Sequence, residues 1–185
     1  MPPPKVMLIR HAEKPGDPLP SFGVKEDGTR SQHSIVVQGW QRAGALIAFF
    51  AAPTLAEIAV PAHLYAASFD KSADPSSTSD VEDISRSRRA IETITPLAHR
   101  LGLTANQTFA VGDEDRLLAD LLLRDGVVLV AWEHKHLPVI AAHLTPAAPN
   151  TWPGDRFDVV WVFDRESSGS YRFLQVAQKL LAGDS

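Results

Sequence analysis

The sequence predicts an α/β protein with three α/β/α layers, in which helices cover both faces of a mostly parallel central sheet. Short apolar, β-prone runs alternate along the chain with segments whose apolar residues recur at helical spacing. Strands that alternate with helices are joined by crossovers, and crossover connections favour parallel pairing. Five runs have the character of buried strands: residues 5–9, 63–67, 108–111, 127–132 and 157–163.

Four further stretches have the pattern of helices. Residues 38–50 place Trp40, Ala43, Ile47 and Phe50 at helical spacing, which predicts one apolar face. The same reasoning predicts helices at residues 87–101, 114–123 and 136–144.

The last part of the chain departs from this alternation. Two strand-like runs flank the turn-forming residues 166–170, so residues 164–174 predict a hairpin at the edge of the sheet. We find no internal repeat and no convincing linker in the 185 residues. The chain therefore predicts a single domain that spans residues 1–185.

Composition narrows the classes of function. A net charge of −4 gives no reason to expect nucleic acid or an anionic membrane as a partner. The chain has no Cys, which excludes disulfides and thiolate chemistry and leaves His and carboxylates as the available metal ligands. No apolar run approaches the length of a membrane span, and the first strand begins too early for a signal peptide, so we expect a cytoplasmic protein.

The end of the first predicted strand carries Arg10 and His11, directly after an apolar run. Ligand sites in open α/β sheets lie at the carboxyl ends of strands. A cation beside a titratable imidazole at this point suggests an anionic ligand, although a capping Arg and a surface His would give the same pattern. Two long loops, residues 14–38 and 69–84, leave strand ends on the same side and are candidates for the rim of a site.

Two more polar clusters follow the same logic. Ser85, Arg86, Ser87, Arg88 and Arg89 stand where a loop becomes a helix, and free N–H groups at a helix start favour an anion. A solvated basic face is the alternative, but a helix start ordinarily prefers acids, so three arginines there are unexpected without an anion.

The third cluster is Glu133, His134, Lys135 and His136, at the end of the apolar run 127–132. A lone His at this position is more often structural than catalytic. Its pairing with His11, at the end of another parallel strand, favours a shared site.

These motifs resemble those of the histidine phosphatase (phosphoglycerate mutase-like) superfamily. Arg10-His11-Ala12-Glu13 looks like its Arg-His-Gly motif, and Gly39 with Arg42-Ala43 resembles its Gly-x-x-Arg-Ala helix start. Residues 85–93 are similar to its Ser-(x)3-Arg-Ala-x-Gln-Thr pattern, with Arg89 as the matching Arg, and His134 matches the second His. The order and spacing agree from about residue 5 to residue 145.

The resemblance implies a phosphoglycerate mutase-like fold and a phosphatase that needs no metal or other cofactor. His11 would be the nucleophile and would form a phosphohistidine, while Arg10, Arg89 and His134 would hold the phosphoryl oxygens. The physical logic agrees, because phosphoryl transfer depends mainly on positioning and on neutralisation of charge. A metal site at His134 and His136 is disfavoured, because this pair lies where a helix begins.

Departures from the family pattern leave two roles less defined. Asp17 stands where many relatives carry a phosphate-binding Asn, a contact for which Lys14 could compensate, and Ala12 and Arg86 replace a Gly and a Pro. For the acid that protonates the leaving oxygen we select Glu114 in the run 113–115. The alternatives are Glu13, Glu133, or a helix-capping role for the whole acidic run.

Three functions are consistent with this pattern. The first is a phosphatase acting on a small phosphorylated substrate or a phosphoprotein, by phosphomonoester or phosphohistidine hydrolysis. The second is a phosphoglycerate mutase-type transfer, for which 185 residues look short. The third is a non-catalytic module that binds a phosphorylated ligand.

Overall fold

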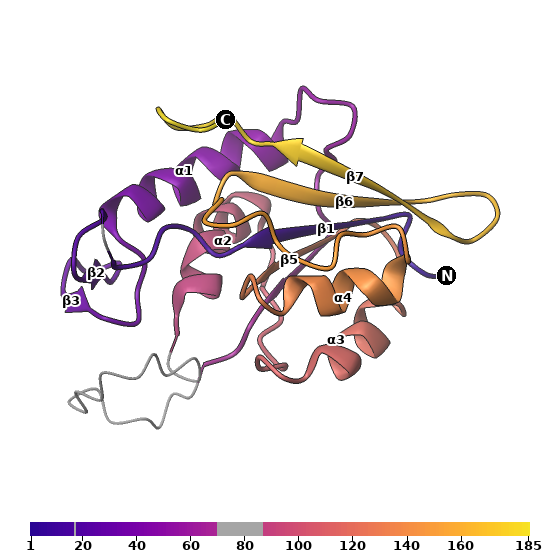
Figure 1. Cartoon of the computed structure of the whole chain (residues 1–185), viewed down its shortest axis with the longest axis horizontal. Helices are drawn as coiled ribbons and strands as arrows, with labels where there is room; N and C mark the ends of the chain where they lie inside the picture. Colours follow the sequence, from indigo (N-terminus) through magenta and orange to yellow (C-terminus); the bar gives the residue numbers. More distant parts are fainter. Residues whose placement is uncertain (17, 70–86) are drawn as a thin grey trace.

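A computed structural model describes residues 1–16, 18–69 and 87–185 of the chain. The sequence predictions for Asp17, Ser85 and Arg86, and for nearly all of the loop at residues 69–84, lie outside these ranges. Five strands form the central sheet, in the order β4-β5-β1-β6-β7 (Figure 1). Their bounds are Lys5–Arg10 for β1, His63–Ala66 for β4, Val128–Trp132 for β5, Val159–Arg165 for β6 and Tyr171–Ala177 for β7.

The sheet is mixed in direction. Strands β4, β5 and β1 run parallel to one another, whereas β6 pairs antiparallel with β1 and β7 pairs antiparallel with β6. The α/β class is confirmed, and so is the hairpin at the sheet edge, since β6 and β7 flank the predicted turn. The expectation of a mostly parallel sheet holds for the three strands on the β4 side.

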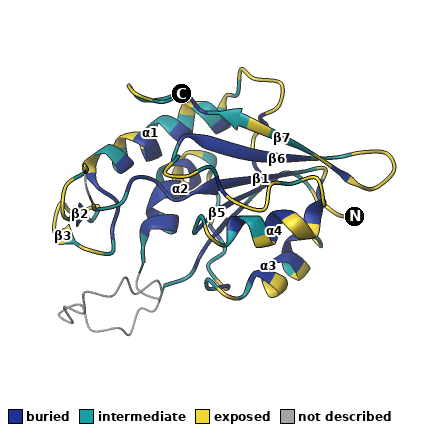
Figure 2. Cartoon of the chain, viewed as in Figure 1, coloured by how far each residue is buried: buried dark blue, intermediate teal, exposed yellow. Residues whose placement is uncertain are grey.

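In the described ranges, four helices cover the sheet. Helices α1 and α2 pack together on one face, and α3 and α4 lie on the other (Figure 1). Strands β1, β4, β5 and β6 are buried along most of their length, whereas β7 at the edge is mostly half-buried or exposed (Figure 2). The four helices are Val37–Ala51, Arg89–Leu101, Glu114–Leu121 and Leu137–Leu144, each within a few residues of its predicted range.

One predicted strand is wrong. Residues 108–111 form no strand, although the segment lies beside the β4 side of the sheet through an isolated bridge between Tyr65 and Asn106 and a hydrogen bond from the Ser68 N–H to the Phe109 carbonyl at 2.8 Å. Side chains bind two backbone N–H groups that a strand would use for pairing. The Asn106 amide oxygen accepts from the Thr108 N–H, and the Asp113 carboxylate accepts from the Ala110 N–H. Phe109 is buried in the core, which explains the apolar pattern without a strand.

The long loop at residues 14–38 holds a small second sheet that the sequence did not predict. Strands β2 (Gly23–Val24) and β3 (Arg30–Ser31) pair antiparallel within it. The N–H of Val24 also donates to the carbonyl oxygen of Ile35 at 2.9 Å, which ties this small sheet to the chain just before α1.

Candidate active site

Three neighbouring parallel strands end at the same level. Arg10 of β1 pairs with Trp132 of β5, and Ala66 of β4 pairs with Ala131. The next N–H groups continue the ladder, from His11 to the Trp132 carbonyl at 3.1 Å and from Ala67 to the Ala131 carbonyl at 3.3 Å. The residues that follow the three strands therefore meet at one edge, as the sequence predicted for His11.

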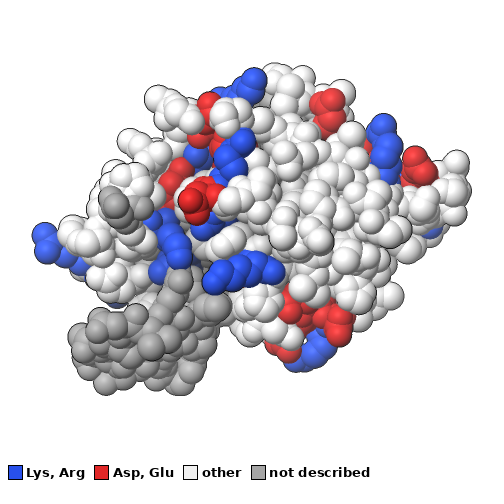
Figure 3. Space-filling view, viewed as in Figure 1, with Lys and Arg blue, Asp and Glu red and all other residues white. Residues whose placement is uncertain are grey.

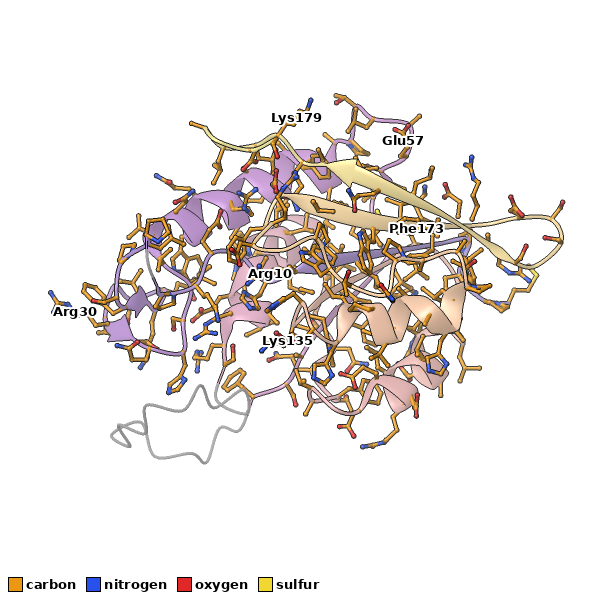
Figure 4. The ribbon with its side chains drawn as sticks, in the orientation of Figure 1. Arg10, Arg30, Glu57, Lys135, Phe173 and Lys179 are labelled. Atoms are coloured by element: carbon orange, nitrogen blue, oxygen red, sulfur yellow. The ribbon has the colours of Figure 1, made fainter. Side chains whose placement is uncertain are left out.

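A pocket lies at this edge. It is lined from the strand ends, from the start of α2 and from the loop before α3, and basic side chains gather on this face of the molecule (Figure 3). Arg10 and Lys135 come from neighbouring strand ends and lie close together in the view (Figure 4). The lining residues are His11, Ala67, Ser87, Arg89, Ala90, Val111, Glu133 and Lys135.

The orientation of His11 is fixed by the backbone beside it. Its Nδ1 lies 2.8 Å from the carbonyl oxygen of Ala12. A carbonyl oxygen can only accept, so Nδ1 carries the proton and the neutral ring keeps its lone pair on Nε2. The Ala12 N–H donates to the Thr93 hydroxyl at 2.7 Å, and that hydroxyl donates to the Arg89 carbonyl, so α2 also holds this turn in place.

The surroundings of His11 favour the neutral ring. His11 is only 5% exposed, and this burial is the main reason why the pKa of His11 falls well below its usual value. The positive charges of Arg89, Arg10 and Lys14 lower the pKa of His11 further. At neutral pH the imidazole is therefore uncharged and able to act as a nucleophile.

The two predicted phosphate-binding arginines are buried beside this ring. Arg10 lies with its guanidinium carbon 3.9 Å from the centre of the Phe157 ring, and Arg89 donates to the carbonyl oxygen of Gln32 at 2.9 Å. Arg89 lines the pocket directly, whereas Arg10 and Lys14 lie close enough to affect the pKa of His11.

His134 lies near the same cations. Burial and the charge of Arg10 lower the pKa of His134, and Lys14 acts on it as it does on His11. The Nδ1 of His134 is 2.8 Å from the Glu133 carboxylate, which opposes this shift. The structure thus places His134 near the same cations as His11. Its neighbours Glu133 and Lys135 line the pocket, whereas His134 itself is not among the lining residues.

Glu114 is buried against the end of β5. Its Oε1 accepts from the Trp132 indole N–H at 2.9 Å and from the Gly112 N–H at 3.0 Å, and it lies 3.0 Å from Nδ1 of His136. Val111, three residues earlier in the loop before α3, lines the pocket, whereas Glu114 is not among the lining residues. A role for Glu114 as the acid stays a prediction.

A buried ion pair supports the turn after His11. The Oε1 of Glu13 accepts from Nε and a terminal nitrogen of Arg42 at 2.9 and 2.7 Å, and both groups are almost completely buried. Arg42 also contacts the carboxylate of Asp184 at 2.8 and 3.1 Å. Helix α1 can approach the turn this closely because Gly39 has no side chain: a Cβ there would lie 2.9 Å from the Glu13 carbonyl oxygen.

Sequence reasoning pointed to most of these residues but missed Phe157. Phe157 belongs to none of the polar clusters, and only its contact with the Arg10 guanidinium places it at the site. Lys135 belongs to the predicted cluster after β5, and the structure adds that it lines the pocket together with Arg89. In the described part of the chain, no three His, Asp or Glu side chains are arranged to hold a metal ion. Within the same ranges, no helix has the length and apolar character needed to cross a membrane.

Comparison with known proteins supports the fold. No protein-family model and no curated protein matches the chain. Among solved structures, the protein histidine phosphatase SixA complexed with tungstate has a TM-score of 0.54 at 15% identity, covering 94% of this chain and 97% of that one. A mycobacterial glucosyl-3-phosphoglycerate phosphatase complexed with inorganic phosphate has a TM-score of 0.52 at 14% identity, covering 94% and 95%. The chain therefore has the fold of these phosphatases, which is the phosphoglycerate mutase-like architecture that its motifs predicted.

Proposed function

We propose that this protein is a phosphatase that hydrolyses phosphomonoesters or phosphohistidine through a phosphohistidine formed on His11. The observation that carries the proposal is a buried imidazole whose Nδ1 proton is held by a backbone carbonyl, in a pocket that it shares with Arg89. Both structural neighbours are phosphatases solved with an oxyanion, tungstate or phosphate, which agrees with a phosphoryl-binding pocket.

In the first step, Nε2 of His11 forms a bond to phosphorus while the bond from phosphorus to the leaving oxygen or nitrogen breaks. The leaving group takes a proton as it departs. In the second step, water attacks the phosphohistidine, releases inorganic phosphate and restores neutral His11. Arg10, Arg89 and His134 would bind the phosphoryl oxygens in both steps and stabilise the charge that they carry. Lys14 would add a further positive charge at the rim.

The source of the proton has two candidates. Glu114 is the residue that the sequence selected, but its Oε1 is already engaged by Trp132, Gly112 and His136. Glu133 lines the pocket that contains His11. Replacing each in turn by Gln separates them, because loss of the acid should slow substrates with poor leaving groups much more than p-nitrophenyl phosphate.

The decisive experiment is hydrolysis of p-nitrophenyl phosphate in the presence of EDTA. We expect activity that resists EDTA in the native protein, and none in His11→Ala. His99→Ala is the matched control, because His99 is an exposed residue near the end of α2 and should have no effect on turnover. Activity that EDTA removes, or that survives in His11→Ala, would contradict the mechanism. Tungstate binding without turnover of any phosphorylated substrate would favour a binding module.

A further inference from the structure

The segment before β6 places an aromatic ring against both Arg10 and His11. The Arg10 guanidinium carbon is 3.9 Å from the centre of the Phe157 ring, and the His11 ring centre is 6.1 Å from it, at an interplanar angle of 49°. The sheet explains this placement: β6 is the antiparallel neighbour of β1, with Ile9 opposite Val160, so the residues before β6 lie beside those after β1.

Phe157 is held firmly by its own neighbours. The Arg156 carbonyl accepts from the Trp152 indole N–H at 2.9 Å, and the Arg156 guanidinium pairs with the Asp158 carboxylate. Asp158 is fixed in turn, since its carboxylate accepts from the Ser185 N–H at 3.0 Å and its carbonyl from the Gln178 N–H at 2.7 Å. The chain on both sides of Phe157 is therefore held in place, which keeps the ring beside Arg10 and His11.

The position of the Phe157 ring beside Arg10 and His11 has two physical consequences. A guanidinium over an aromatic face is attracted by the ring quadrupole, and the contact restricts the orientation of the fork. A terminal nitrogen of Arg10 also donates to the Gly154 carbonyl at 3.5 Å, so the segment that carries Phe157 contacts the guanidinium at a second point. The ring also lies beside the buried imidazole, so its apolar surface is placed to limit the access of water to this group.

We propose that Phe157 is a positioning residue, which orients the Arg10 guanidinium toward the bound phosphoryl group and shields the His11 imidazole from water. The inference rests on the proposed function for its consequence in turnover. Its two physical effects, on oxyanion binding and on the protonation of His11, are measurable without turnover.

The charged and titratable groups around His11 belong to several elements. Arg10 and Lys14 come from β1 and the loop after it, Arg89 from α2, and Glu133, His134 and Lys135 from the loop after β5. All of them remain when Phe157 is replaced. Burial is the largest cause of the low pKa of His11, so a change in His11 titration in such a variant mainly reports the loss of apolar cover.

The test compares Phe157→Ala, Phe157→Leu and Phe157→Tyr. The probe for Arg10 is tungstate affinity measured by calorimetry, and the probe for His11 is its pKa measured by NMR titration of the imidazole. We expect Ala and Leu to weaken tungstate binding by about two- to thirty-fold, because both lack the aromatic face, and Tyr to restore it. The pKa of His11 should rise toward its usual value in Ala and stay low in Leu and Tyr, which keep the apolar cover.

Phe173→Ala is the matched control. Phe173 of β7 is also partly buried and packs against Trp161 and Phe163, but it lies well away from Arg10 (Figure 4). It should lower the stability of the fold without changing either probe. Unchanged tungstate affinity and His11 pKa in Phe157→Ala would overturn the inference, as would equal changes in Phe173→Ala. If Phe157→Ala fails to fold, the Leu and Tyr variants still distinguish the ring face from simple bulk.

These measurements separate this inference from the proposed function. If His11→Ala retains turnover while the Phe157 variants behave as expected, the phosphatase mechanism fails and the positioning role stands. If His11→Ala is inactive while the tungstate affinity and the His11 pKa are unchanged in the Phe157 variants, the mechanism stands and the positioning role fails.

Discussion

Arg89 offers the sharpest test of the oxyanion site, because it is the only Arg among the residues that line the described pocket. We expect Arg89→Ala to weaken tungstate binding by about ten- to one-hundred-fold. A hydrogen bond to a charged group contributes about 1.5–3 kcal/mol, and each 1.4 kcal/mol changes affinity tenfold. Arg89 as a whole is 7% exposed, so solvent screens this interaction weakly.

The same substitution should raise the pKa of His11, because the charge of Arg89 is the second largest cause of its depression, after burial. It should also cost about 0.5–1.5 kcal/mol of folding stability, since the hydrogen bond to the Gln32 carbonyl is lost. Calorimetric titration with tungstate at fixed pH and salt measures the binding, and urea unfolding measures the stability.

Arg88→Ala is the matched control for this prediction. Arg88 precedes α2, its guanidinium lies over the Phe69 ring, and its Nε is 3.6 Å from Glu92, outside the pocket lining. The Arg88→Ala substitution removes one positive charge from the start of α2, as Arg89→Ala does. If both variants weaken tungstate binding equally, general electrostatic attraction explains the affinity and the specific role of Arg89 is refuted.

Three further predictions concern the support beneath the site. Gly39→Ala should lower stability by about 1–3 kcal/mol and reduce turnover, because its Cβ would lie 2.9 Å from the Glu13 carbonyl oxygen. Gly44→Ala lies in the same helix, and its added Cβ would meet no atom within 4 Å, so this variant should stabilise the fold by about 0.5–1 kcal/mol. Urea denaturation compares the two variants, and equal effects on the free energy of unfolding would contradict the steric argument. Arg42→Met should cost about 3–5 kcal/mol in the same assay, because it leaves two buried carboxylates without their partner, and a loss below about 1 kcal/mol would show that Glu13 and Asp184 relax without it. Burial opposes ionisation of Asp184, but hydrogen bonds from Arg42 and from the N–H groups of Leu180 and Leu181 lower the pKa of Asp184 from 3.8 to about 2. The resulting contribution to stability is complete above about pH 5 and is lost as the pH falls through 2, so acid unfolding of Asp184→Asn should lack this component.

The sequence could predict the parts of this site that depend on strand ends. A buried parallel strand that stops at a polar pair places that pair at a known edge of the sheet, which is why His11 and His134 could be assigned together. The basic helix start predicted an anion near residues 85–89, because such a start is unusual in the absence of an anion. The choice of Arg89 among the three arginines came from the resemblance to the histidine phosphatase motifs. The strand-end argument itself needs only the local pattern and the direction of the strand.

The residue that sequence reasoning missed depends on long-range packing instead. Phe157 reaches Arg10 across 147 positions of the chain, through an antiparallel pairing of β6 with β1 that no local pattern specifies. The false strand at residues 108–111 has the same origin. Its apolar residues are explained by burial of Phe109, and whether a buried segment pairs as a strand depends on neighbours that lie far away in sequence.

The arrangement around His11 also explains how one imidazole can meet two opposing demands. A nucleophile must stay neutral, yet a bound phosphoryl dianion raises the pKa of any histidine beside it. Burial and the charges of Arg89, Arg10 and Lys14 lower the pKa of His11 before the anion arrives. The rise on binding then begins from well below the usual value, and the same cations that lower the pKa are those expected to bind the anion. In the proposed mechanism, charge and burial at the end of β1 would therefore serve affinity and reactivity together, which a surface histidine beside the same arginines would not achieve.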